Sequence, residues 1–280
     1  MTMKKNTVLK DWLRARATII LQIFLCLSVA LPIIKPIGLP VPISTYTKGV
    51  YEIVESIEPG SIVLFTNDVS AGGWGEMASP TIAVMQHLFR RPVKIVFVDF
   101  FEDSPILTEI ALNKVDKDDK VYGVDYVHLG FIPGYEMAIA MFAKSIWTAF
   151  PADYHGTALN ELPLMANLKD ASDFDIQIET QTVPAVPTSF MLQHIHSPYN
   201  VPLVVLSTAV SSPGLMPYLA SGDISGITIG VKGGAEYEIL IKTPGSGAAT
   251  MDAMSTSHLL LITVLIIGNV FYFIKKYRRP

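Results

Sequence analysis

Three acidic residues stand where an α/β protein can carry out acid–base chemistry. Asp68 and Asp99 lie at or just after short apolar runs that predict buried strands, and Glu102 follows Asp99 closely. Ligands of a doubly wound sheet bind beyond the carboxyl ends of its strands, so we expect these residues to border one cleft. Carboxyl groups around a cleft can donate and accept protons. Asp68, Asp99 and Glu102 are therefore candidate catalytic residues.

Glycine-rich segments follow the first, third and fifth of the strands that the sequence predicts. Glycines at a helix N-terminus can present backbone N–H groups to an anion, and a nearby lysine adds charge. The simpler alternative is that glycine only permits tight turns. The candidate ligand-binding residues are Asn67, Asp68, Gly73, Gly75, Gly130, Gly134, Lys232, Gly233 and Gly234.

A dinucleotide motif is only partly present. Gly73, Gly75 and Ala78 fit G-x-G-x-x-A, and Asp99 stands near the position of a ribose-binding acid. However, the segment from Asn67 to Gly72 separates the predicted strand from the first glycine, whereas the glycines of a true fingerprint follow the strand directly. The sequence therefore identifies no cofactor.

Two further motifs are weaker. His194 and His196 would lie on one side of an extended segment, as a metal pair requires, with a third ligand from Asp68, Asp99, Glu102 or Asp103. Surface histidines are the simpler interpretation. Ser207 follows a predicted strand, but no G-x-S-x-G elbow surrounds it, so a turn or helix cap suits it better.

Alternating strands and helices must position these residues. The apolar runs predict strands, and the segments between them predict helices, which together indicate a three-layer, mainly parallel, Rossmann-like α/β domain. The predicted strands are 61–65, 93–100, 121–129, 202–206 and 227–231, and the predicted helices are 80–89, 104–113, 134–150 and 213–221. Residues 152–200 are irregular and acidic, so we interpret them as an insertion without an assigned role.

The segment 134–150 is apolar around most of a helical circumference. Such a helix must be covered on more than one side. Burial by neighbouring elements is the simplest explanation, an interface between subunits is the second, and contact with lipid is the third.

Two apolar runs enclose this domain. Residues 18–34 and 258–274 contain no charged side chain, and clusters of Lys and Arg flank their outer ends. Such runs are long enough to predict membrane helices, and the positive-inside rule places both basic ends in the cytoplasm. The first run is either an uncleaved signal anchor, which we favour, or a signal peptide cut after Ser28-Val29-Ala30.

The predicted organisation follows from these runs. It consists of a basic leader (1–17), a signal anchor (18–34), a proline-rich linker (35–42), an extracytoplasmic α/β domain (43–244), a flexible linker (245–257), a second membrane helix (258–274) and a basic tail (275–280). Either interpretation of the first run leaves the α/β domain outside the cytoplasm.

The charge of the chain bears on its partners, and its cysteine content bears on its location. The whole chain carries −4, and because both ends are basic, its middle is strongly acidic, which argues against nucleic acid. Cys26, the single cysteine, lies in the first apolar run, and no N-glycosylation sequon occurs. A prokaryotic cell surface is the expected location.

Two amides lie at similar depths in the predicted membrane helices. Gln22 and Asn269 have no water to bond there, so we expect them to face a helix interface within one hairpin or between subunits. The alternative is that each amide bonds to a carbonyl of its own helix.

These features predict a membrane-anchored extracytoplasmic α/β domain that assembles with itself or with a membrane-protein partner and binds a ligand in the strand-end cleft. A membrane-tethered hydrolase or transferase that uses the acidic cleft is the alternative.

Overall fold

The computed structural model describes residues 2–182 and 186–277, with side chains described for 16–182 and 187–277. The chain divides into two compact units. One unit is Val41–Gly247, and the other combines Met1–Pro40 with Ala248–Pro280.

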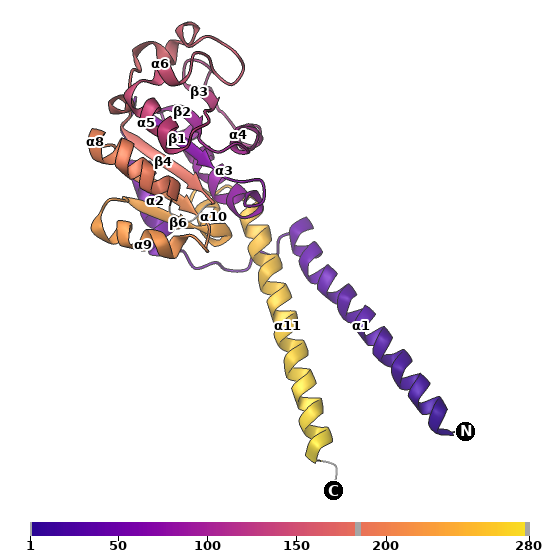
Figure 1. The fold of residues 1–280 in the computed structure, drawn as a ribbon. Coiled ribbons are helices and arrows are strands. Elements are labelled where there is room, and N and C mark those ends of the chain that lie inside the picture. Colours follow the sequence, from indigo (N-terminus) through magenta and orange to yellow (C-terminus); the bar gives the residue numbers. More distant parts are fainter. Residues whose placement is uncertain (1, 183–185, 278–280) are drawn as a thin grey trace. The chain divides into compact units, whose positions relative to one another are not determined.

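The first unit, which we call the α/β unit, is built on a six-stranded sheet in which every strand pairs in parallel (Figure 1). The spatial order is β3-β2-β1-β4-β5-β6, which is the order of a doubly wound sheet. The prediction of a mainly parallel α/β sheet is therefore confirmed, and the order reverses between β1 and β4. The strands are β1 (Ile62–Asp68), β2 (Lys94–Asp99), β3 (Tyr126–Phe131), β4 (Ile176–Gln181), β5 (Leu203–Ser207) and β6 (Gly226–Ile229).

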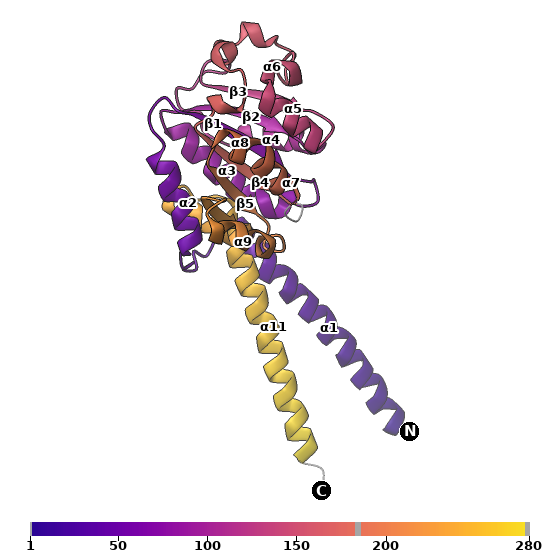
Figure 2. The same ribbon diagram turned by 60° about the vertical axis from the view of Figure 1, so that its left-hand side comes forward.

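Helices cover both faces of the sheet, as the two views show (Figure 2). One face packs against α2 (Thr45–Ser56), α3 (Trp74–Arg90), α4 (Ser104–Leu112) and α10 (Gly230–Leu240). The other packs against α5 (Glu136–Lys144), α6 (Ile146–Ala149), α7 (Val186–Met191), α9 (Ser212–Ser221) and shorter turns. These turns are η1 (Leu159–Glu161), η2 (Pro163–Asn167), η3 (Ala171–Asp173), η4 (Leu192–His196) and α8 (Ser197–Tyr199).

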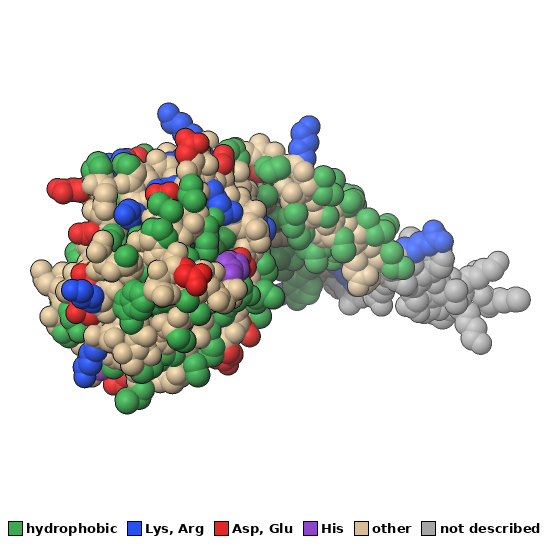
Figure 3. Space-filling view, turned by 90° about the horizontal axis from the view of Figure 1, so that it is seen from above, with side chains coloured by type: hydrophobic (Ala, Val, Ile, Leu, Met, Phe, Trp, Pro, Cys, Tyr) green, Lys and Arg blue, Asp and Glu red, His purple; other side chains and the backbone are tan. Residues whose placement is uncertain are grey.

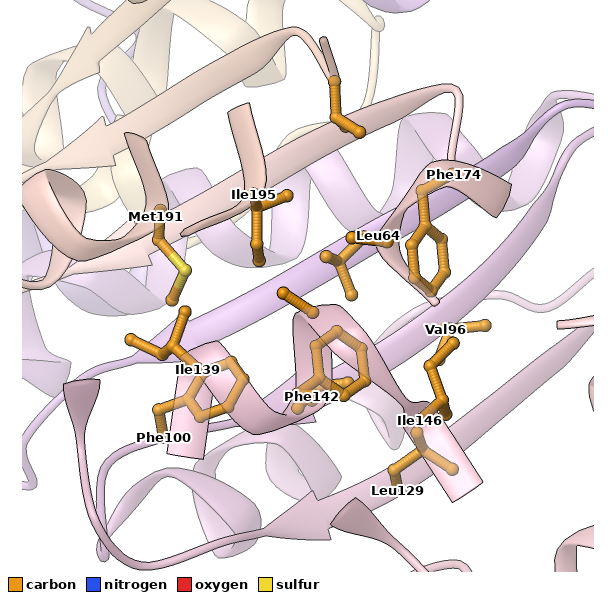
Figure 4. Packing of buried hydrophobic residues seen from close by; sticks show 14 of the residues in the cluster. Leu64, Val96, Phe100, Leu129, Ile139, Phe142, Ile146, Phe174, Met191 and Ile195 are labelled. Carbon is orange, nitrogen blue, oxygen red and sulfur yellow. The ribbon is translucent and has the colours of Figure 1, made fainter. Parts of the chain in front are cut away.

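Apolar strand residues form a separate core on each face. On the α5 face, Leu64 and Phe100 lie among Ile139 and Phe142 (Figure 4). The rings of Phe100 and Phe142 meet edge to face with centroids 5.8 Å apart. Because both faces are buried, most strands are apolar at nearly every position.

The central strand β4 corrects the interpretation of residues 152–200 as an irregular insertion. Ile176–Gln181 lies between β1 and β5, although its sequence IQIETQ alternates apolar and polar residues. Such alternation is typical of a half-exposed strand. Here, in contrast, every residue of β4 is buried, so polar side chains occupy core positions.

The apolar segment 134–150 forms two helices, not one. The chain breaks at Ser145, whose hydroxyl accepts a hydrogen bond from Thr148 N and begins α6. Ala143 on α5 is buried, as the core interpretation expects, whereas Met137 is 76% exposed. The interpretation of the exposed side as a subunit interface stays a prediction.

The second unit contains α1 (Thr2–Ile34) and most of α11 (Ser246–Tyr277). Both helices are long and apolar enough to cross a membrane, by length and composition alone. Within this unit, the Asp252 carboxylate accepts hydrogen bonds from the backbone N–H groups of Ile37, Gly38 and Leu39 at 2.7–3.0 Å.

The start of α11 differs from the predicted flexible linker 245–257, because the chain is helical from Ser246 onward. The buried Glu238 carboxylate accepts hydrogen bonds from Gly245 N and Gly247 N at 3.1 and 2.9 Å. An acidic side chain at a helix N-terminus accepts hydrogen bonds from the free N–H groups and is attracted by the positive end of the helix dipole. This capping explains why a glycine-rich segment is helical.

Candidate functional site

The point where the strand order reverses carries a buried set of polar side chains. Asp68 ends β1, and its register partner on β4 is Gln181, while Glu179 lies two residues earlier on β4. Side chains alternate along a strand, so all three point to the α5 face, where Leu64 lies. Each is at most 1% exposed. We call Asp68, Glu179 and Gln181 the carboxyl cluster.

Both acids of the carboxyl cluster favour their protonated form. Burial raises the pKa of Asp68 to about 8, the charge of Asp99 adds to the rise, and the N–H of Phe100, 3.0 Å from Asp68 Oδ1, opposes it. Burial and the charge of Asp68 raise the pKa of Glu179 well above its ordinary value. Among the described residues, neither acid forms an ion pair with Lys, Arg or His.

Several oxygens of the cluster have no hydrogen-bond partner in the described part of the chain. They are Asp68 Oδ2, both carboxyl oxygens of Glu179, and Gln181 Oε1. Thr188 on α7 lies beside Glu179, and its hydroxyl opposes the rise in the pKa of Glu179, although the two side chains complete no hydrogen bond by distance and angle. Buried polar atoms nearly always have partners, so unpartnered ones indicate a place where water or a ligand binds.

Tyr135 lies against the same cluster and has a strained backbone. Its φ of +47° and ψ of −114° are rare for a residue with a side chain, and Gly134 before it has φ +121°. Burial raises the pKa of the Tyr135 phenol, and the charges of Asp68, Glu102 and Glu179 raise it further. Strain of this kind is concentrated at functional sites.

The opposite face of the sheet holds a second polar group, which we call the histidine cluster: Asp99, Thr108, Glu109 and His128. His128 Nε2 lies 2.6 Å from Asp99 Oδ2, and its Nδ1 lies 2.7 Å from Glu109 Oε1. Thr108 donates a hydrogen bond to Asp99 Oδ1 at 2.8 Å. Burial alone would lower the pKa of His128, but the hydrogen bonds to both carboxylates raise it to about 9.

These contacts separate the predicted acids. Asp99 is buried on the α4 face and bonded to His128, so its carboxylate is not free to bind a ribose. Asn67, also on that face, donates to Thr108 Oγ1 at 2.9 Å. Glu102 is exposed, but its charge acts on Tyr135. Of the three predicted acids, therefore, only Asp68 belongs to the carboxyl cluster.

The glycines after β1 lie at the start of α3 and not in a phosphate-binding turn. Gly73 caps the helix, and a Cβ there would meet Thr182 Cγ2 at 2.3 Å. Glu76, in the first turn, accepts a hydrogen bond from Ala209 N at 2.7 Å. A carboxylate at this place repels a phosphate. Gly75 faces open space.

The remaining predicted glycines shape the backbone. Gly130 has φ +83°, and a Cβ there would lie 3.3 Å from the ring of Tyr154. Gly233 and Gly234 lie inside α10, where a Cβ at Gly234 would meet Ser79 Oγ at 2.3 Å. These two glycines permit α10 to approach its neighbours closely.

Lys232 is likewise engaged. Its ammonium group pairs with Glu236 and donates to the carbonyl of Pro42. Its charge is therefore already matched by a carboxylate.

The premise of an extended His194-x-His196 pair is wrong, because both histidines lie in a π-helical turn. His194 Nε2 lies 3.2 Å from Glu136 Oε1, and His196 Nδ1 donates to Val201 O. Among the described residues, no group of three or more His, Cys, Asp or Glu side chains is arranged to hold a metal ion.

The helix amides and Ser207 also have local partners. Asn269 Nδ2 donates to Leu265 O of its own helix at 2.9 Å, which is the intrahelical alternative. Pairing of Asn269 with Gln22 of a neighbouring subunit stays a prediction. Ser207 accepts a hydrogen bond from Gln181 Nε2 at 2.9 Å and so supports the carboxyl cluster.

Sequence reasoning missed Glu179, Gln181, Tyr135 and His128. Glu179 and Gln181 were hidden by the polar alternation of β4. His128 lay in the predicted strand 121–129, where a polar residue among apolar ones could have indicated a buried partner.

No family model matches the chain, and no curated protein is significantly similar to it.

Proposed function

We propose that this protein is a membrane-anchored extracytoplasmic α/β enzyme, a hydrolase or transferase, with Asp68 and Glu179 as its acid–base pair. The observation that carries this proposal is the carboxyl cluster itself. Two buried, coupled carboxyl groups with raised pKa values lie where the strand order reverses, the place at which doubly wound sheets bind ligands.

The two acids suit different roles. A group with a pKa near the working pH exchanges protons most effectively, and burial raises the pKa of Asp68 to about 8. Asp68 is therefore the proton-transfer residue. Burial and the charge of Asp68 raise the pKa of Glu179 well above its ordinary value, which favours a protonated Glu179 in the empty site. The Tyr135 phenol is a second donor at the same place.

The site disfavours anionic substrates. The exposed carboxyl of Glu102 acts on Tyr135, and ionisation of either acid of the cluster adds negative charge there. Glu76 occupies the α3 N-terminus. This electrostatic arrangement supports a neutral or cationic substrate in place of a dinucleotide.

Assembly is a second candidate function, supported by the exposed side of α5. Met137 and Met141 are one turn apart, 76% and 38% exposed, and Trp147 on α6 is 39% exposed. On the face seen in Figure 3, acidic, basic and apolar side chains are interspersed over the α/β unit. A methionine pair of this kind suits a second subunit or a membrane-protein partner.

The two apolar helices anchor the α/β unit in this proposal. Basic residues flank residues 18–34 on the N-terminal side and residues 258–274 on the C-terminal side, which supports a cytoplasmic position for both ends. In sealed right-side-out vesicles, tags at Thr2 and Pro280 should resist protease while the α/β unit is cleaved. A mature N-terminus near Leu31 would show a cleaved signal peptide instead.

Activity is tested on the full chain in detergent or lipid nanodiscs. Native mass spectrometry identifies any retained ligand and the oligomeric state, and a panel of neutral and cationic ester, amide and glycoside substrates then tests turnover. Asp68→Asn and Glu179→Gln should each abolish the turnover that wild type shows, and Asp119→Asn on the exposed surface should not. Turnover that survives the double variant would refute the assignment.

A further inference from the structure

Strands β1 and β4 carry several buried side-chain oxygens that have no hydrogen-bond partner among the described residues. Three buried amides donate their N–H groups to hydroxyls: Asn67 to Thr108 at 2.9 Å, Gln177 to Thr66 at 3.2 Å, and Gln181 to Ser207 at 2.9 Å. In all three the amide oxygen has no partner among the described residues.

Other oxygens on the same strands also lack a partner in the described part of the chain. They are Asp68 Oδ2, both oxygens of Glu179 and the Thr180 hydroxyl, of which the hydroxyl and a protonated carboxyl can donate as well as accept. Amide oxygens accept hydrogen bonds and cannot donate them. A ligand that satisfies the amide oxygens must therefore bring donors.

The carboxyl cluster combines one of these amide oxygens with the two acids. Gln181 is the register partner of Asp68, and its oxygen is the free atom because Ser207 occupies its nitrogen. The charge of Asp68 acts on Glu179, so the two acids are also neighbours. A fully buried, unpartnered amide oxygen thus stands beside two acids that lack a cationic partner.

We propose that Asp68, Glu179 and Gln181 bind the positively charged ammonium group of a small amine. This inference rests on the proposed function, since it names the substrate class of the same site. An ammonium group has three N–H donors and a positive charge, and the cluster offers three acceptor side chains and no cation. In the empty site, burial keeps the carboxyl groups protonated. Binding of an amine puts a positive charge beside them.

The binding reaction must then release protons. A nearby cation favours the ionised form of a carboxyl group and lowers its pKa. The titratable groups that act on the cluster or on Tyr135 beside it are Asp99, which lies on the opposite face of the sheet, and Glu102; with Tyr135 itself, all of them are acids. Proton release on binding therefore comes from Asp68 and Glu179.

The test is isothermal titration calorimetry of the full chain in detergent at neutral pH, with ethylamine hydrochloride as the probe. Saturable binding is expected, with a heat that changes between phosphate and HEPES buffers because protons are released. Gln181→Leu should weaken binding by about tenfold or more. The Asp68→Asn/Glu179→Gln double variant should lose both binding and buffer dependence, while Asp119→Asn should keep both.

Three matched probes test which property of the ammonium group the site recognises. Ethanol has similar size without charge, tetramethylammonium has charge without N–H donors, and sodium chloride supplies an alkali cation. Equal binding of any one of them would overturn the assignment to an ammonium group. Tryptophan fluorescence of each variant checks that it is folded.

The outcomes also separate this inference from the proposed function. If ethylamine fails to bind but turnover still depends on Asp68 and Glu179, the amine assignment is wrong and the acid–base assignment stands. If ethylamine binds and no turnover depends on these residues, the site is a binding site and the enzyme proposal fails.

Discussion

Asp68→Asn should change how the stability of the protein depends on pH. Asp68 binds its proton more tightly in the folded protein, where its pKa is about 8, than in the unfolded chain, where it is 3.8. Between these values the folded protein keeps a proton that the unfolded chain has lost. Each rise of one pH unit in this window therefore lowers the free energy of unfolding by about 1.4 kcal/mol.

The magnitude follows from the width of the window. From 3.8 to about 8 is about four pH units, so Asp68 alone lowers the free energy of unfolding by about 6 kcal/mol at alkaline pH relative to pH 4. The free energy of unfolding of a typical domain is about 5–15 kcal/mol, so this change is a large part of it. Asparagine cannot ionise and can still accept the hydrogen bond from Phe100 N. The variant should therefore match wild type near pH 4 and be more stable above about pH 8.

The assay is urea unfolding of the full chain in detergent, followed by tryptophan fluorescence across this pH range. Trp74 and Trp147 report on the α/β unit. Asp119→Asn, at an exposed position, should follow the wild-type curve at every pH. Parallel curves for wild type and Asp68→Asn would show that Asp68 is already ionised in the folded protein, and the argument for an acid–base pair would fail.

Three other predictions use the same unfolding assay. His128→Ala leaves buried carboxylates without a cationic partner and should cost roughly 3–5 kcal/mol; a loss below about 1 kcal/mol would mean that no buried charge pair exists. Gly234→Ala forces α10 against α3 and should lower the free energy of unfolding by roughly 1–3 kcal/mol. A Cβ at Gly75 meets nothing within 4 Å, so Gly75→Ala should leave it unchanged. Equal effects would contradict the close packing at Gly234. Ala143→Glu buries an unpaired charge and should unfold the domain. The Met137→Glu variant should stay folded, and any oligomer formed through α5 should dissociate. An unchanged oligomer excludes that interface.

The alternation of elements could be predicted because it leaves a strong pattern. A strand buried on both faces is apolar at nearly every position, as Val63 to Phe65 and Ile95 to Val98 are. The predicted strand 93–100 and helix 104–113 accordingly lie within one or two residues of β2 and α4. Asp68 was also identifiable, because the end of such a strand is visible in the sequence.

The partner of Asp68 could not be predicted in the same way. Glu179 lies on a strand whose polar residues mimic a half-exposed strand, so the rule that finds buried strands passes over it. Tyr135 appeared only as part of an apolar segment. Its strained conformation depends on how the chain turns from β3 into α5.

The sequence by itself determined the fold class, the two apolar helices and one acid of the site, since local periodicity and charge record how each segment meets its surroundings. Only the tertiary structure decided which acids meet. Asp68 and Asp99 both end neighbouring strands, yet they point to opposite faces of the sheet, one toward Glu179 and the other toward His128. The face that a side chain reaches depends on strand register, which long-range pairing sets and no local stretch of sequence encodes.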